Sequence, residues 1–99
     1  MQWYTLDEYK NPVATVSFPT DEEHKKHQRV AFTMLKSGKR VSTVFLFLDY
    51  NYSAGGEPIL FETMVFPENN FSELECERYH TYKDAVAGHK RMVKKWKND

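Results

Sequence analysis

The chain has 99 residues, 40% of them hydrophobic and 15% aromatic, which supplies one globular core and leaves no room for a second. Its 14 basic and 14 acidic residues balance, so the total charge does not favour nucleic acid, and its single cysteine excludes an intramolecular disulfide. The longest apolar run, 44–48, is far too short to span a membrane, and no hydrophobic signal core follows the N-terminus. We therefore expect a soluble, unprocessed, cytoplasmic chain with a single domain over residues 1–99.

The first part of the chain predicts a hairpin and then a helix. Residues 3–6 and 13–16 are strand-like and flank Asn11-Pro12, which is typical of a turn. The segment 20–23, reading TDEE, matches a capping box, so a helix should begin at Thr20. Apolar or semi-apolar residues then recur at three- and four-residue spacing, and Gly38 is a typical stop, so this helix is predicted to continue to about Lys36. The recurring residues are His27, Val30, Ala31, Met34 and Leu35.

Residues 40–66 predict a long β-hairpin. Two runs rich in β-branched and aromatic residues, Val41–Tyr50 and Ile59–Phe66, are joined by a loop that carries Gly55, Gly56 and Pro58. Because side chains alternate across a strand, each run has two distinct faces. Both faces are apolar, which is typical of strands in the middle of a sheet, or of a sheet face held for another chain.

The C-terminal part predicts a turn, an irregular or edge segment, and a second helix. The turn is 67–70, and the acidic stretch that follows runs to Glu77. Thr81 should cap the helix, whose buried stripe comprises Tyr82, Ala85, Val86, His89, Met92, Val93 and Trp96. Gly88 lies inside this helix at a cost of up to about 1 kcal/mol relative to alanine, so we expect it to pack closely against another backbone. Together the elements predict an α+β fold in which a small antiparallel sheet of two hairpins packs with two amphipathic helices.

Three segments carry a resemblance to a known family: LDEYKNPV at 6–13, the hairpin 40–66, and ERYHTYKDAVAGH at 77–89. They resemble short proteins encoded by tailed bacteriophages and prophages, whose members look like LDENGNPV, then VSTVFLGLDH with a glycine-rich loop and LFETMVF, then RYSTWEEAEAGH. That family has no assigned activity, so the resemblance implies a phage origin and a layout rather than a reaction. This chain departs from the pattern at Tyr9-Lys10, where the family has Asn-Gly, at Phe47, where it has Gly, and at Tyr50, where it has His.

Few residues point to catalysis or metal binding. A polar cluster of Asp49, Glu62, Arg78 and His89, or His80 in place of His89, would offer acid/base or metal-binding groups. The simpler interpretation is that Asp49 caps a loop and Glu62 pairs with Arg40 or Arg78. His24 and His27 lie three apart on the first predicted helix, but no third ligand can be assigned, so neither a metal nor a cofactor is predicted. Acidic neighbours disfavour a thiolate at Cys76, and no nucleotide-binding or hydrolase motif is present.

These observations favour an interaction protein over an enzyme. The first hypothesis is a phage-encoded protein that binds a host or phage macromolecule in the host cytoplasm, or its own copy, through the sheet face that carries Phe45, Phe47, Phe61 and Val65, or through the opposite face. The alternative is nucleic-acid binding by the basic face of the last helix, formed by Lys90, Arg91, Lys94 and Lys95. A third hypothesis is a small enzyme centred on Asp49, Glu62 and His89.

Overall fold

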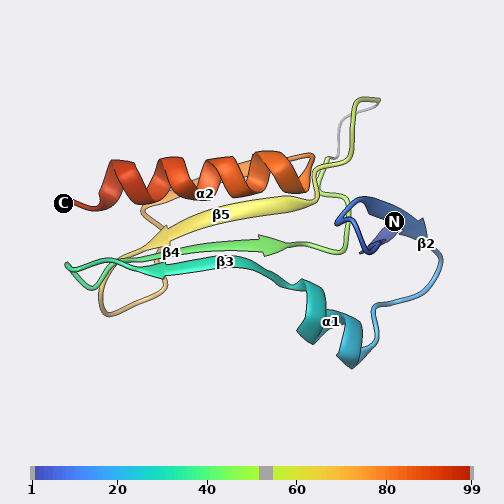
Figure 1. The fold of residues 1–99 in the computed structure, drawn as a ribbon, viewed down its shortest axis with the longest axis horizontal. Helices are drawn as coiled ribbons and strands as arrows, with labels where there is room; N and C mark the ends of the chain where they lie inside the picture. The colour runs from blue at the N-terminus through green and yellow to red at the C-terminus, as the bar shows by residue number, and fades with distance from the viewer. Residues whose placement is uncertain (1, 52–54, 99) are drawn as a thin grey trace.

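The computed structural model describes residues 2–51 and 55–98 and confirms the α+β class. The N-terminal strands β1 (Trp3–Leu6) and β2 (Pro12–Thr15) form an antiparallel hairpin of their own. A second antiparallel sheet has the order β3-β4-β5-β6 and comprises β3 (Arg29–Met34), β4 (Arg40–Phe45), β5 (Phe61–Phe66) and β6 (Glu75–Tyr79). The helices are α1 (Asp21–His27) and α2 (Tyr82–Trp96). Figure 1 shows α2 lying along one face of the four-stranded sheet, with α1 and the N-terminal hairpin at one end.

The first helix begins as predicted but is much shorter. Its capping box is present: the Glu23 backbone N–H donates to Thr20 Oγ1 at 3.1 Å, and the Thr20 N–H donates to the Glu23 carboxylate at 3.2 Å. The helix ends at His27, so the prediction that it continues to Lys36 is wrong. Residues 29–34 form β3 because their side chains also alternate with period two, and pairing with β4 satisfies the backbone groups on the side that faces β4.

The turn between β3 and β4 explains Gly38. Its N–H donates to the Leu35 carbonyl at 2.9 Å, and the Leu35 N–H donates to the Lys39 carbonyl at 2.8 Å. Gly38 has a φ of +91°, the left-handed conformation that a short hairpin loop requires at this position. The glycine that resembled a helix stop therefore closes a β-hairpin.

The central hairpin is confirmed, with strands shorter than predicted. Arg40 pairs with Phe66 and Phe45 with Phe61. Beyond Phe45 the chain leaves the sheet at Phe47, whose φ is +63°. The Phe47 carbonyl accepts from the Tyr4 N–H at 2.8 Å, so this segment crosses to the N-terminal hairpin instead of extending β4.

Lys10 is the second non-glycine residue with a positive φ, +67°, among those described. It lies in the turn between β1 and β2. Phe47, described above, is the first. A residue with a Cβ pays roughly 1 to 2 kcal/mol in this conformation, whereas glycine adopts it freely. The two positions are therefore points of backbone strain in this chain.

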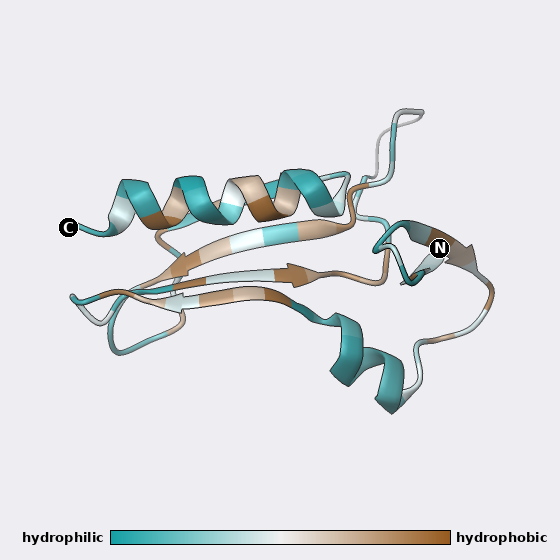
Figure 2. Ribbon diagram, viewed as in Figure 1, coloured by the Kyte–Doolittle hydropathy of each residue, from teal (hydrophilic) through white to brown (hydrophobic). Residues whose placement is uncertain are grey.

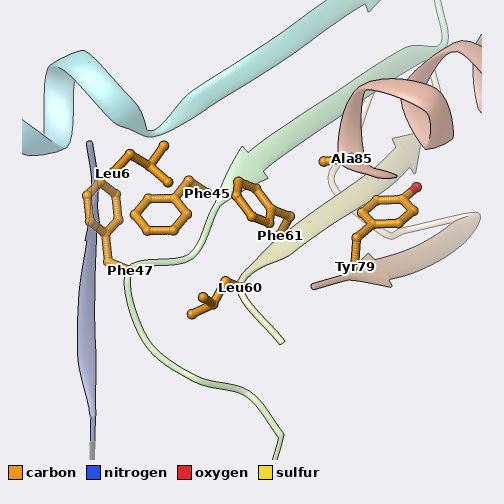
Figure 3. Close-up of a cluster of buried hydrophobic side chains, with 7 residues drawn as sticks. All are labelled: Leu6, Phe45, Phe47, Leu60, Phe61, Tyr79 and Ala85. Atoms are coloured by element: carbon orange, nitrogen blue, oxygen red, sulfur yellow. The ribbon is translucent and has the colours of Figure 1, made fainter. Parts of the chain in front are cut away.

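The main core joins the N-terminal hairpin to the sheet and to α2. Figure 3 shows Phe47, Phe45 and Phe61 side by side between Leu6 and the start of α2. The ring centroids of Phe45 and Phe47 are 4.6 Å apart, and those of Phe45 and Phe61 are 5.2 Å apart. A second cluster under the far end of α2 contains Leu35, Val41, Val65 and Met92.

Only α2 buries an apolar stripe on the sheet. Its fully buried residues are Ala85, Gly88, His89 and Met92, which follow the predicted spacing. In Figure 2 the brown stripe of α2 faces the sheet, whereas α1, with the sequence DEEHKKH, is hydrophilic along its length. The second amphipathic helix that was expected to cover the sheet is thus a short polar helix.

Gly88 makes the close contact that its place in the helix required, but with a side chain and not with a backbone. A Cβ at this position would overlap the ring and hydroxyl of Tyr79 on β6. Because Gly88 has no side chain, α2 can pack closely against the edge strand β6.

We predict that Gly88→Ala destabilises the protein although alanine is the better helix former. Overlap with Tyr79 should cost about 1 to 3 kcal/mol, which exceeds the gain in helix propensity of about 1 kcal/mol. Urea unfolding measures the change, and Lys90→Ala at an exposed position of the same helix is the control. An unchanged or higher midpoint for Gly88→Ala would show that α2 does not depend on this contact.

We predict that Lys10→Gly stabilises the protein by roughly 0.5 to 1 kcal/mol, because it releases the left-handed strain at a small cost in unfolded-state entropy. Lys10→Ala is the matched control, since it removes the same side chain but keeps the strain. Phe47→Gly should instead destabilise the fold, because the core loses a buried ring. Equal unfolding free energies for Lys10→Gly and Lys10→Ala would contradict the assignment of strain.

Candidate functional site

The two faces of the four-stranded sheet have different environments. The face under α2 is closed: Phe45, Phe61 and Val65 are at most 1% exposed. Phe47 is 3% exposed and lies in the same core. The prediction that these four residues form a partner interface is therefore wrong, because they make up the interior. The opposite face, which the sequence left as the other possibility, is the one that no helix covers among the described residues.

We call this opposite surface the open face. The strand register assigns to it side chains from each of the four strands: Phe32, Met34, Arg40, Ser42, Val44, Glu62, Met64, Phe66, Cys76 and Arg78. Leu74, directly before β6, continues the alternation of that strand and lies on the same face. Phe32 is 41% exposed, Leu74 44% and Met34 64%. Phe71, beside Phe66 at a ring distance of 5.7 Å, is 77% exposed. The open face thus exposes an apolar surface, and most of this surface lies at one end of the sheet.

The charged groups of the open face contact other groups of the chain, although the buried Arg40 Nε has no hydrogen-bond partner among the described residues. The Arg78 guanidinium donates to the Glu62 carboxylate at 2.8 Å and lies over the Tyr50 ring, with 5.6 Å to its centroid. Arg40 lies over the rings of Phe66 and Phe71 and donates to the Pro67 carbonyl at 3.0 Å. A partner would therefore meet one ion pair, Arg78 with Glu62, and one cation, Arg40, that is stacked on aromatic rings.

Cys76 also lies on this face, and it is a poor nucleophile. Burial, and then the neighbouring Glu62 carboxylate, raises the pKa of its thiol to about 11. The thiolate is therefore scarce at neutral pH. This agrees with the expectation from its acidic neighbours in the sequence.

The four members of the predicted polar cluster do not come together. Glu62 and Arg78 form a pair on the open face, whereas His89 lies under α2 on the other face. Asp49 caps the loop after β4, where its carboxylate accepts from the backbone N–H groups of Asn51 at 2.7 Å and Ile59 at 2.9 Å. The arrangement matches the simpler interpretation, and it does not bring together Asp49, Glu62 and His89, the three groups on which the enzyme hypothesis was built.

His89 is instead the centre of a buried polar row. Its Nδ1 lies 2.7 Å from Thr43 Oγ1, and its Nε2 lies 2.9 Å from Thr33 Oγ1. Thr43 and Thr63 share a hydrogen bond of 2.5 Å. Hydroxyl groups can donate or accept, so this row satisfies both nitrogens of a neutral imidazole. Burial lowers the pKa of His89.

Tyr79 lies at the edge of this row. Burial raises the pKa of its phenol to about 12. Its hydroxyl makes no hydrogen bond of good geometry within residues 2–51 and 55–98, although Thr63 and Glu77 are close enough to influence its pKa. It faces Gly88 and lines neither of the hollows described below, so it does not mark a binding site.

The basic face of α2 is partly neutralised. Arg91 pairs with Glu77 of β6, and the Lys95 ammonium donates to the Glu75 carboxylate at 2.8 Å. Lys90 and Lys94 are exposed. Of the four cations predicted to contact phosphates, two are thus held by carboxylates of the adjacent edge strand.

The two histidines of α1 have separate environments. His27 is buried and His24 is exposed, with its ring stacked on Phe47 at 5.2 Å. Within the described ranges, no three His, Cys, Asp or Glu side chains are close enough together to hold a metal ion. The same part of the chain contains no helix that is both long enough and apolar enough to cross a membrane.

Two surface hollows lie around the N-terminal hairpin. One, of about 420 Å³, is lined by Gln2, Ala14, Thr15 and Val16. The other, of about 300 Å³, is lined by Tyr4, Pro12, Glu57, Pro58, Leu60, His80 and Thr81. His80 Nδ1 lies 2.8 Å from the Pro58 carbonyl oxygen, and since a carbonyl only accepts, Nδ1 carries the proton and donates it. Neither hollow involves the open face.

Comparison with known proteins adds no relative: no family model, no curated protein and no solved structure matches this chain.

We predict that the free energy of unfolding falls as the pH drops from 7 to 5, because burial lowers the pKa of both His27 and His89 below the ordinary value of 6.5. The unfolded chain then binds protons that the folded chain does not, so stability is full above pH 6.5 and is lost below it, by up to about 1.4 kcal/mol per pH unit for each histidine. The carboxylates with lowered pKa, Glu23 and Glu75, add to the loss only below about pH 4.5.

Urea unfolding at several pH values measures this slope. The variants His27→Gln and His89→Gln should each reduce it, whatever their effect on stability at pH 7, and the double variant should remove it. A slope that persists in the double variant would assign the pH dependence to other groups.

Proposed function

We propose that the chain is a small interaction protein that docks another protein on its open face. Its resemblance to short phage and prophage proteins suggests a host or phage macromolecule as the partner, in the cytoplasm of an infected bacterium, where the protein would act by occluding or remodelling that partner. The observation that supports this proposal most strongly is the exposed apolar surface formed by Phe32, Met34, Phe71 and Leu74. Monomeric proteins rarely leave so many large apolar groups together in solvent.

The character of the open face supports a protein partner over a small molecule. Neither of the two hollows is on it, and small ligands usually bind in concave sites. Aromatic residues, methionine and arginine are enriched at protein interfaces, and the open face carries all three types, including Phe32, Met34 and Arg40. Since Glu62 and Arg78 already pair with each other, docking does not bury an unpaired charge there.

Nucleic-acid binding through α2 is the alternative function. Its support is the exposed pair Lys90 and Lys94, one helical turn apart. Its weakness is that Glu75 and Glu77 hold Lys95 and Arg91, which leaves fewer cations for phosphates.

The proposal predicts that Leu74→Lys abolishes capture of a protein partner while leaving the fold intact, because it places a charge in the exposed apolar surface. Immobilised wild-type protein and this variant would be incubated with nuclease-treated bacterial lysate, and the retained proteins quantified. Lys90→Glu is the matched control on the opposite side of the molecule and should retain the same proteins as the wild type. Retention that survives Leu74→Lys contradicts the proposal. In a separate incubation with labelled DNA or RNA, retention that Lys90→Glu abolishes would favour the alternative.

A further inference from the structure

The sheet has two edges, and only one of them is protected by charge. The outer strand β6 has the sequence ECERY, with three charged side chains in five residues. Two of them, Glu75 and Glu77, hold cations from α2 beside the strand. Charges on an edge discourage pairing with a further strand.

The other outer strand, β3, has no such protection. Its sequence is RVAFTM, with Arg29 at the end as its single charge and no proline. None of its residues is buried, whereas β4 beside it alternates between buried and partly buried residues. Among the described residues, no strand pairs with its outer edge. An unpaired edge with so little charge is a site where another strand can add.

The direction of the backbone groups on β3 follows from its hairpin. The Leu35 N–H donates to the Lys39 carbonyl, so the backbone groups of Leu35 point toward β4. Because these groups alternate in direction along a strand, those of residues 33 and 31 also point toward β4. Phe32 and Met34 therefore present their N–H and C=O groups outward. The irregularity between Arg29 and Ala31 limits the regular edge to residues 31–35.

We propose that this edge pairs with the same edge of a second copy, so that the protein forms a homodimer with a two-fold axis at Thr33. In that register Phe32 lies opposite Met34 of the second copy, and Ala31 opposite Leu35. Arg29 and Lys36 lie outside the regular edge 31–35, so no like charges face each other within the paired segment. The edge is thus complementary to itself in both backbone bonding and side-chain character.

The dimer would have a continuous antiparallel sheet with four strands from each copy. A two-fold axis perpendicular to the sheet keeps both α2 helices on one side and joins the two open faces on the other. Pairing over so short an edge buries less than a standard interface of about 1,600 Å², so we expect reversible association in the micromolar range. This inference does not depend on the proposed function, because self-association and docking of a foreign protein are measured separately.

The test is sedimentation velocity of the pure protein from low to high micromolar concentration, with two charge variants of β3. Wild-type protein should pass from monomer to dimer. The double variants Phe32→Lys with Met34→Lys, and Phe32→Glu with Met34→Glu, should each stay monomeric, and an equimolar mixture of the two should recover the dimer, because like charges then meet opposite ones. Circular dichroism checks that each variant is folded; both changed residues are exposed.

Leu74→Lys is the matched control, since Leu74 is 44% exposed, close to the 41% of Phe32, but lies beside the opposite edge. It should leave the dimer unchanged. A wild type that remains monomeric at every concentration overturns the inference. Dimers that Leu74→Lys dissociates, or that the lysine and glutamate variants do not affect, place the contact elsewhere and also overturn it.

Discussion

The structure depends on one packing constraint: a single amphipathic helix lies on a four-stranded sheet, and it covers one face only. α2 contacts all four strands, and its approach is possible because Gly88 leaves space for the Tyr79 ring. A helix is about 10 Å wide, whereas four strands span roughly 14 to 15 Å between the outermost two, so one helix can close one side of such a sheet. The other helix is too short and too polar to close the second side. The exposed apolar surface is thus a consequence of the fold's helix content.

The core under α2 is unusual in having a polar row through its middle. His89, Thr33, Thr43 and Thr63 satisfy one another where three strands pass beneath the helix. Buried polar groups contribute little net stability, but they are costly when unpaired, so such a row favours the one register that pairs them all. The row therefore explains the buried histidine in structural terms, without a catalytic role.

The N-terminal hairpin is held to the sheet by a segment under strain. At Phe47 the chain turns from β4 toward β1 with a positive φ, and its ring fills the main core against Phe45. Glycine would make the same turn more easily but would leave that space empty. At this position the chain thus has a strained backbone, and the packing of the Phe47 ring in the core compensates for that strain. Lys10, which is not in the buried core, has no comparable compensation.

Local sequence signals determined the elements that form through interactions between residues close together in the chain. The capping residues Thr20 and Thr81 and the stripe of α2 all act within a few residues, and each appears where the sequence indicates it. The N-terminal hairpin also forms, but its turn lies at 7–11 and not at Asn11-Pro12, since Pro12 is already the first residue of β2. The α+β class follows from these elements. The pairing of Glu62 with Arg78 was among the simple alternatives that the sequence left open, and Asp49 caps its loop as one of them stated.

Tertiary structure alone decided the rest, because it depends on contacts between distant residues. Residues 29–34 fit both a helical and a strand spacing, and the hydrogen bonds to β4 chose the strand. The alternation of Phe45, Phe61 and Val65 showed that they share a face, but not which face α2 would cover, so an interior was mistaken for an interface. The same choice separated His89 from Glu62. Sequence periodicity specifies which side chains lie together on an element, whereas the packing of elements determines which of those groups meets solvent.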